Sequence, residues 1–253
     1  MSRELSVRFR ITHARALDFE VSRAMNECPS IAFVVDDDVS VRESLELLLR
    51  DDGLDVKTFV SALEFLSDPP VTVPSCLVLD ISLPGLNGLD LQKRVAVERQ
   101  EMPIIFITGH GDIPMTVQAM KAGAQEFLTK PFSDEILLKA VRNALVRSKR
   151  LLDRSIEVRT LKGYYSRLTA REREVMAFVV VGLSNKQIGS ELNISEVTVK
   201  AHRGNMMRKM KAESLAELVS ISAQLRLRRP SDTTLPRARA APSAHADLAL
   251  RTR

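Results

Sequence analysis

The chain has 253 residues, 45% hydrophobic and 27% charged, which suits a globular protein with room for two modest domains. It contains no apolar run of about 18 residues and no signal-peptide-like start, so we expect a cytoplasmic protein without a membrane span. The two cysteines and four histidines show no metal-ligand spacing, which argues against a disulfide framework and a zinc site.

Charge divides the chain into two halves. Residues 31–132 carry 16 acidic and 8 basic side chains, whereas residues 133–230 carry 20 basic and 10 acidic ones. An acidic half would suit a bound cation, and a basic half would suit nucleic acid. The pattern therefore predicts two domains with different partners.

In the first half, short apolar runs alternate with amphipathic stretches. We expect strands within 31–38, 55–60, 76–80, 103–109 and 126–130, and helices within 40–53, 61–68, 88–99, 113–123 and 133–152. Capping boxes, Ser40 with Glu43 and Ser61 with Glu64, would begin the first two helices. This alternation predicts an α/β domain over 31–148: a five-stranded, doubly wound parallel sheet of the flavodoxin-like type.

Polar side chains stand where these strands end. Asp36, Asp37 and Asp38 end the first strand, Asp80 the third, Thr108 the fourth and Lys130 the fifth. The carboxyl ends of parallel strands meet at one edge, where clustered carboxylates would need a cation such as Mg²⁺. A carboxylate can also attack phosphorus, and a nearby hydroxyl and ammonium would hold the phosphoryl oxygens. We therefore predict that Asp80 accepts a phosphoryl group.

The second half shows a helical pattern only. Residues 149–165 read as a helical linker, and an all-α domain of four short helices follows over 166–228, within 169–182, 184–192, 195–210 and 214–225. Ser or Thr starts the first, second and fourth helices, with a Glu or Gln three residues later: Thr169 with Glu172, Ser184 with Gln187, and Ser214 with Glu217.

Helix 195–210 follows the preceding helix after a short turn, and its periodicity gives it two distinct faces. Val199, Met206 and Met210 share one face and should be buried. The opposite face should meet DNA in the major groove, and it holds Val197, Lys200, Ala201, Gly204 and Arg208. Lys186 and Thr198 could touch the DNA backbone, whereas Arg203 lies nearer the buried face and would pair with Glu172 or Glu174.

Both halves resemble known families. Residues 31–148 resemble a two-component receiver domain in "VVDDD", "LVLDISLPGLNG", "FITGHGDIPM" and "FLTKPF", and the last two stretches are similar to the FixJ branch in particular. The stretch "LTAREREVMAFVVVGLSNKQIGSELNISEVTVKAHRGNMMRKM" resembles the LuxR-type helix-turn-helix, and "SLAELV" resembles its closing helix. The resemblance covers about residues 31–228 and matches both domains in order, as in the NarL/FixJ class.

The receiver resemblance assigns roles to individual positions. It implies that Asp36 and Asp37 form the acidic pocket, that Asp80 is the phosphoacceptor, and that Mg²⁺ is the cofactor. The protein ligands of the ion would be Asp37, Asp80 and the Ser82 backbone carbonyl. Thr108 would be the switch hydroxyl, Lys130 the phosphoryl-binding ammonium and Phe127 the switch aromatic, and Lys130–Pro131 would be a cis bond.

The resemblance further implies a response regulator without enzymatic output. A cognate histidine kinase would phosphorylate Asp80, Thr108 would move inward, and the 112–129 face would then form a homodimer. Two helix-turn-helix domains would engage two half-sites of double-stranded promoter DNA, with RNA polymerase as a further partner. No membrane partner is expected.

Two other functions deserve comparison. A haloacid-dehalogenase-type phosphatase also uses a strand-end Asp, but that family requires a second Asp at the position that Ser82 occupies here. That function would also leave the basic second domain unexplained. A receiver with an RNA-binding or protein-binding output remains open, although the exposed face of helix 195–210 favours DNA. We expect residues 1–30 and 229–253 to be disordered, and translation to begin at Met25.

Overall fold

The computed structural model describes residues 29–109 and 113–227 of the chain. Contacts divide the chain into two units that meet in sequence at Ile156 and Glu157, and each unit is described by itself. Most of the expected N-terminal extension and the whole expected tail 229–253 lie outside the described residues. Within the described ranges, every helix is too short or too polar to cross a bilayer.

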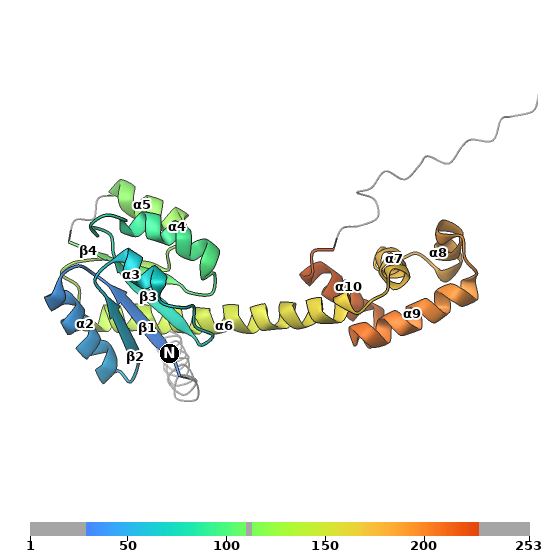
Figure 1. The fold of residues 1–253 in the computed structure, drawn as a ribbon, viewed down its shortest axis with the longest axis horizontal. Helices are drawn as coiled ribbons and strands as arrows, with labels where there is room; N and C mark the ends of the chain where they lie inside the picture. The colour runs from blue at the N-terminus through green and yellow to red at the C-terminus, as the bar shows by residue number, and fades with distance from the viewer. Residues whose placement is uncertain (1–28, 110–112, 228–253) are drawn as a thin grey trace, which may run out of the picture. The chain divides into compact units, whose positions relative to one another are not determined.

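The first unit is built on a five-stranded parallel sheet (Figure 1). Its strands run in the order β2-β1-β3-β4-β5, and their bounds are β1 Ile31–Val35, β2 Asp55–Phe59, β3 Ser75–Asp80, β4 Ile104–Thr108 and β5 Glu126–Thr129. All four pairings are parallel, and β3 is buried along its whole length. The doubly wound, flavodoxin-like sheet predicted from the alternating pattern is therefore confirmed.

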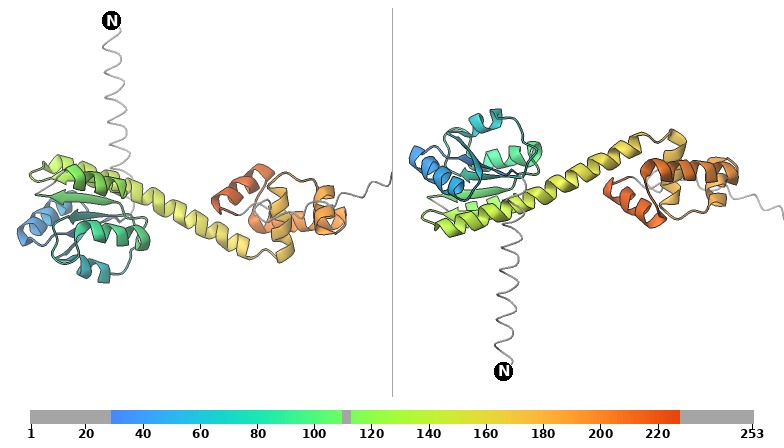
Figure 2. Two further views of the ribbon diagram at one scale, coloured as in Figure 1. Left: turned by 90° about the horizontal axis from the view of Figure 1, so that it is seen from above. Right: turned by 90° about the horizontal axis from the view of Figure 1, so that it is seen from below.

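Helices cover both faces of this sheet (Figure 2). One apolar core lies against α2 (Val39–Asp51) and the start of α6 (Asp134–Ser166). The other lies against α3 (Ala62–Ser67), α4 (Gly88–Glu98) and α5 (Ile113–Lys121), and contains the buried rings of Phe33, Phe65 and Phe106. Because both faces are covered, the strands can be continuously apolar until they reach their polar carboxyl ends.

The first helix starts earlier than its sequence pattern predicts. Asp38 is the N-cap of α2, and its carboxylate accepts hydrogen bonds from the backbone N–H groups of Ser40 and Val41. The predicted capping box of Ser40 with Glu43 is wrong, because Ser40 already lies inside the helix and Asp38, at the true N-cap, accepts from the free N–H groups of the first turn.

At α3, Ser61 caps the helix as expected by accepting from the Glu64 N–H. The Glu64 carboxylate, however, accepts from the N–H of Val60 rather than from that of Ser61, so the reciprocal half of the predicted box is displaced by one residue. Residues 149–165 all belong to α6, which is helical as predicted for the linker.

The second unit packs short helices around one core. They are α7 (Ala170–Val179), α8 (Asn185–Leu192), α9 (Glu196–Met210) and α10 (Leu215–Gln224), and they enclose the end of α6 as well. Complete capping boxes begin α7 and α8, as predicted. At α10, Ser214 accepts from the Glu217 N–H as expected, but the Glu217 carboxylate accepts from the Glu213 N–H.

Candidate functional site

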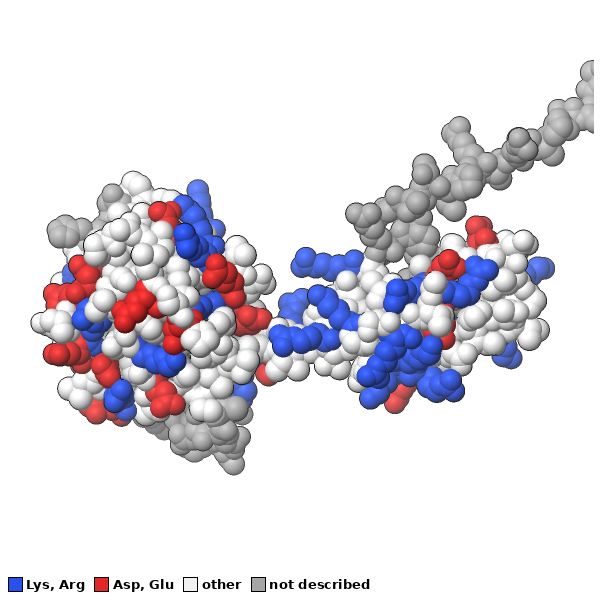
Figure 3. Space-filling model, viewed as in Figure 1, with Lys and Arg blue, Asp and Glu red and all other residues white. Residues whose placement is uncertain are grey.

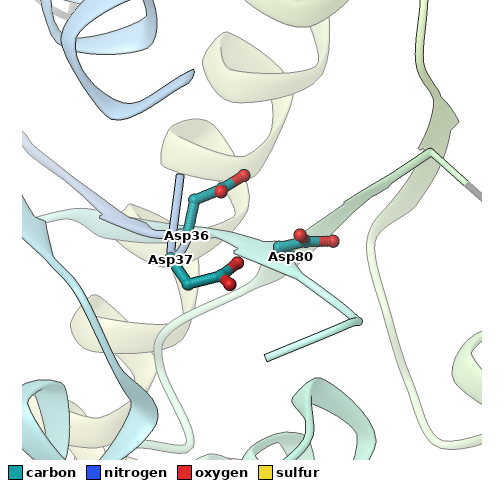
Figure 4. Close-up of side chains that lie close together, drawn as sticks. All are labelled: Asp36, Asp37 and Asp80. Atoms are coloured by element: carbon teal, nitrogen blue, oxygen red, sulfur yellow. The ribbon is translucent and has the colours of Figure 1, made fainter. Parts of the chain in front are cut away.

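Three carboxylates converge at the carboxyl edge of the sheet (Figure 4). Asp36 and Asp37 follow β1, Asp80 ends β3, and one oxygen from each lies within 4.8 Å of the others. Asp36 is completely buried and Asp80 is 8% exposed, whereas Asp37 is exposed. β1 and β3 are neighbours in the sheet, so their side chains meet although 43 residues separate Asp37 from Asp80 in the sequence.

A lysine from the fifth strand end partly neutralises this cluster. Lys130 Nζ lies 2.8 Å from Asp36 Oδ2 and 3.9 Å from Asp80 Oδ2. The Lys130 backbone N–H donates to the Thr108 carbonyl at 2.8 Å, which ties the loop after β5 to the end of β4. The Lys130–Pro131 peptide bond is cis, as the resemblance implied.

The environment of Asp80 disfavours the ionised form of its carboxyl group. Burial raises the pKa of the Asp80 carboxyl, while the Lys130 ammonium and the N–H of Ser82 lower it, and the net shift is upward. The Ser82 N–H donates to Asp80 Oδ1 at 3.3 Å. An added cation would favour the ionised form. The carboxylate cluster supplies the hard oxygen ligands that Mg²⁺ takes in proteins.

The two expected switch residues lie beside the carboxylates. Thr108 is completely buried at the end of β4. Phe127 is half-buried on β5, and its ring centroid lies 6.3 Å from that of Phe106 on the neighbouring strand. The structure therefore brings Asp36, Asp37, Asp80, Thr108 and Lys130 to one edge of the sheet. Phe127 lies two positions further back along β5, since Thr129 is the residue that pairs with Thr108.

The sequence pattern did not identify two residues that shape the pocket. A Cβ on Gly88 would lie 2.6 Å from the Asp80 carbonyl oxygen and 2.9 Å from Ile81 Cα, so only glycine lets α4 begin this close to the Asp80 loop. Arg42 on α2 donates from Nη1 to the Asp36 carbonyl at 2.7 Å. The glycine in "LNGL" was a possible signal for the first; the sequence offers none for the second, which depends on how α2 meets β1.

The second candidate site is the exposed face of α9. Val199, Met206 and Met210 are at most 1% exposed, as predicted for the core face. The opposite face carries the predicted DNA-contacting residues, all exposed: Val197, Lys200, Ala201, Gly204 and Arg208. A Cβ on Gly204 would meet no protein atom within 4 Å, so no internal contact requires glycine there.

Two further expected contacts lie at helix starts. Lys186 is exposed near the start of α8, and Thr198 is exposed in the first turn of α9. The Thr198 hydroxyl lies 2.7 Å from the Ser195 hydroxyl, which caps α9 by accepting from the Thr198 N–H. Arg208 is held along the helix by a hydrogen bond to Asn205.

The expected partner of Arg203 is wrong. Arg203 Nη1 donates to Asn185 Oδ1 at the start of α8, so this side chain joins α9 to α8 instead of to α7. Lys209, further along α9, reaches Glu172 at 2.7 Å. Glu174 pairs with Arg171 within α7.

Glu172 joins the capping box of α7 to the recognition helix. Its Oε2 accepts from both the Thr169 N–H and Lys209 Nζ, and the residue is 3% exposed. Burial acts to raise the pKa of Glu172, but the hydrogen bonds from Lys209 and Thr169 outweigh it and lower the pKa. This carboxylate therefore fixes one end of α9 against α7.

The turn between α8 and α9 needs a second glycine. A Cβ on Gly189 would lie 2.8 Å from the Ile194 carbonyl oxygen, and Asn193 adopts a left-handed conformation at the end of α8. This close approach sets the angle at which α9 leaves the turn.

Figure 3 shows basic side chains gathered on the second unit and mixed charge on the first.

Comparisons with known proteins identify both domains. The response regulator receiver domain matches residues 32–142, and the luxR family of bacterial regulatory proteins matches residues 166–222. Nodulation protein W of Bradyrhizobium diazoefficiens is 51% identical over 196 residues, which cover 78% of this chain and 86% of that protein. The response regulator TmoT of Ectopseudomonas mendocina is 46% identical over 202 residues, covering 80% and 92%.

A solved structure extends the likeness to three dimensions. The low-resolution structure of the response regulator StyR superposes with a TM-score of 0.66 at 47% identity, covering 78% of this chain and 99% of that one. A parallel sheet with strand-end carboxylates, followed by a helix-turn-helix, defines a two-component response regulator with a DNA-binding output. The chain belongs to the response regulators that join a receiver domain to a LuxR-type domain, and it regulates transcription.

Proposed function

We propose that Asp80 is the residue phosphorylated, and that Asp37, Asp80 and the Ser82 carbonyl hold Mg²⁺ while Asp36 completes the acidic metal pocket. The single observation that supports this most is the convergence of the three carboxylates within 4.8 Å. Bound Mg²⁺ would supply positive charge that offsets their repulsion and the developing phosphoryl charge. The proposed domain bounds are 31–148 for the receiver and 166–228 for the DNA-binding domain, joined by the helical linker 149–165.

In the proposed reaction, an Asp80 carboxylate oxygen attacks the phosphorus of a phosphohistidine on a cognate kinase. The new O–P bond gives an acyl phosphate, and the N–P bond of the donor breaks. Lys130, already 3.9 Å from Asp80, would hold a phosphoryl oxygen, and the Thr108 hydroxyl would turn to hold another. Phe127 would follow Thr108 inward, since their strands are adjacent.

The kinase has to approach Asp80 from the carboxyl edge of the sheet. A groove of ≈ 630 Å³ opens there between α2 and the loop after β5, lined by Val41, Leu47, Leu48, Lys130 and Phe132 among others. Leu47 is 65% exposed on its rim. Because Lys130 lines both the groove and the acidic pocket, a kinase helix seated in the groove would lie next to Asp80.

The output would follow from a dimer. Ile113, Val117 and Met120 on α5 are 81%, 44% and 43% exposed, and they lie on the 112–129 face beside Thr108 and Lys130. Pairing of two such faces would present two α9 helices to promoter half-sites in the cytoplasm, with RNA polymerase as a further partner.

Labelling with acetyl phosphate and Mg²⁺ tests the acceptor. Asp80→Asn should abolish acid-stable incorporation of phosphate, because no nucleophilic oxygen remains. Asp38→Asn is the matched control: Asn also caps helices well, so α2 should persist and labelling should fall only in part. Labelling of Asp80→Asn at the normal stoichiometry would refute the assignment.

A further inference from the structure

A cavity of ≈ 280 Å³ lies in the second unit, apart from the outer face of α9. Its wall is formed by Tyr165 at the end of α6, by α7, by α10, and by Arg226 and Leu227, which follow α10. None of the described residues in this wall belongs to α8 or α9. A partner held here would therefore leave the outer face of α9 free for DNA.

Much of the cavity wall is apolar. Met176 and Val180 line it from α7, Val219 lines it from α10, and Leu227 lines it from the turn after α10. Val219 is 41% exposed, so apolar surface is open to solvent here. Sites for whole small molecules usually span roughly 300–1,000 Å³, whereas a single anchoring side chain of a protein partner needs less room. The size of this cavity therefore suits one large apolar side chain.

The same wall carries two arginines, Arg173 and Arg226, and no acidic residue among those that the structure describes. Arg173 Nη2 donates to the Ser166 carbonyl at 3.0 Å, and the guanidinium carbon of Arg173 lies 5.2 Å from the centroid of the Tyr165 ring. These contacts fix the position of the guanidinium, but within the described ranges no carboxylate forms an ion pair with it.

The turn after α10 places the second arginine. The Leu227 N–H donates to the Ser222 carbonyl at 3.2 Å, and Arg226 has a φ of 51°, the left-handed conformation that glycine usually takes at a helix end. This turn returns Leu227 to the apolar core, whereas the Arg226 side chain is exposed. Its guanidinium has no hydrogen-bond or ion-pair partner in the part of the chain that the structure describes. Both arginines are therefore available to carboxylates from outside.

We propose that this cavity binds an acidic segment of a partner protein, which inserts one large apolar side chain and pairs its carboxylates with Arg173 and Arg226. Charge favours this occupant over two others. Residues 157–227 carry 12 basic and 7 acidic side chains, so the same unit of a second copy would bring like charge. Residues 228–253 carry six arginines and two aspartates, so they too would be repelled.

A tryptophan peptide tests the site, because the chain itself contains no tryptophan. The full-length, unphosphorylated protein is titrated into a peptide whose single tryptophan is flanked on both sides by glutamates. Burial of the indole should shift its emission to shorter wavelength, and the shift should saturate. A matched peptide with glutamine in place of every glutamate should bind about tenfold more weakly. Absence of a saturable shift, or equal affinity of the two peptides, would overturn the proposal.

Variants then place the binding in this cavity. Arg226→Gln should weaken the glutamate peptide about tenfold, whereas Arg167→Gln, an exposed arginine of the same unit that is absent from the cavity wall, should leave the affinity unchanged. Ala223→Phe, which fills the cavity from an exposed position, should abolish the shift. Equal effects of the two arginine variants would mean unspecific attraction to a basic surface, and full binding by Ala223→Phe would place the peptide elsewhere. Either result would refute the site.

Sedimentation of the same unphosphorylated samples tests the second copy as the occupant. The parent protein and Ala223→Phe should sediment alike, because no second copy enters the cavity. Self-association of the parent that Ala223→Phe prevents would assign the cavity to a second copy and contradict the proposal. Since neither experiment involves phosphorylation, their outcome is independent of the role proposed for Asp80.

Discussion

Asp80 combines a buried position with a reactive charge. Burial raises the pKa of its carboxyl above the ordinary Asp value, and Lys130 and the Ser82 N–H only partly offset this. The ionised group is therefore held at a cost in stability until a cation or a phosphoryl group joins it. Nucleophilic reactivity and structural strain thus have the same physical cause here, which is the removal of solvent from a carboxylate.

The stability of the Mg²⁺-free receiver should fall as pH rises through the raised Asp80 pKa. A carboxyl whose folded pKa is raised binds its proton more tightly in the folded state, so the loss starts at the ordinary Asp pKa of 3.8 and is complete above the raised value. Urea unfolding followed by circular dichroism should show Asp80→Asn to be more stable than the parent at neutral pH. Mg²⁺ should remove the difference; a less stable Asn variant would contradict this reading.

Gly88→Ala should destabilise the receiver by about 1–3 kcal/mol and slow labelling by acetyl phosphate. The new Cβ would overlap the Asp80 carbonyl oxygen and Ile81 Cα, so the loop that carries Asp80 has to move. Gly204→Ala is the control, since its Cβ meets nothing and should stabilise α9 by roughly 1 kcal/mol. Unchanged labelling of Gly88→Ala would show that the loop tolerates the shift.

At the scale of the element, α9 has one face for the core and one for DNA. Lys200 and Arg208 are both exposed on the outer face, eight residues apart. Lys200 lies in the first turns, where a recognition helix reaches base edges, and Arg208 lies where the helix passes the phosphates. Substitution of each residue should therefore change DNA binding in a different way.

Lys200→Ala should cost about 1–3 kcal/mol of binding and relax base preference at one position of the site. Arg208→Ala should weaken binding to all sequences alike and reduce the salt slope by about one. Affinities for the target and its single-base variants at two salt concentrations measure both effects. The opposite pattern would mean that the helix enters the groove in another orientation.

Glu172 connects α7 and α9, and its charge should make the second unit sensitive to acid. A carboxyl whose folded pKa is lowered contributes stability above its unfolded pKa, ordinarily 4.5, and loses it as pH falls through the lowered value. Glu172→Gln should cost about 1–2 kcal/mol at neutral pH and should remove this acid-side loss. The only two tyrosines, Tyr164 and Tyr165, belong to this unit and the chain has no tryptophan, so tyrosine fluorescence reports its unfolding directly. An unchanged pH profile in Glu172→Gln would count against the role.

At the scale of the whole molecule, the proposed function requires that phosphorylation changes how two chains associate. The apolar side chains exposed on α5 lie beside the proposed switch residues, so a rearrangement at Asp80 can alter this face directly. Other exposed apolar residues, such as Leu63, lie on α3 instead. Substitutions on α5 and α3 can therefore distinguish the proposed association surface from other exposed apolar residues.

Phosphorylation should shift the protein from monomer to dimer at micromolar concentration. Val117→Asp should prevent this by placing a charge in the paired faces, whereas Leu63→Asp, a change of the same kind on α3, should leave the dimer intact. Sedimentation velocity before and after treatment with acetyl phosphate measures the shift. A monomer under both conditions, or equal behaviour of the two variants, would exclude this surface.

The sequence by itself determined the order of the elements and the position of the chemistry. The predicted strands end in Asp36, Asp80, Thr108 and Lys130. Because parallel strands bring their carboxyl ends to one edge of the sheet, this pattern predicts that the four side chains lie close together. The helical period likewise placed Val199 and Met206 in the core and Lys200 outside.

Only the tertiary structure decided which neighbours complete each site. The pairing of Lys209 with Glu172, the bond from Arg203 to Asn185 and the need for Gly88 all depend on how one element meets another. Local periodicity fixes which face of a helix is buried, because that depends on its own 3.6-residue repeat. It does not fix which distant side chain that face meets, since long flexible side chains select their partners only after the backbones have packed.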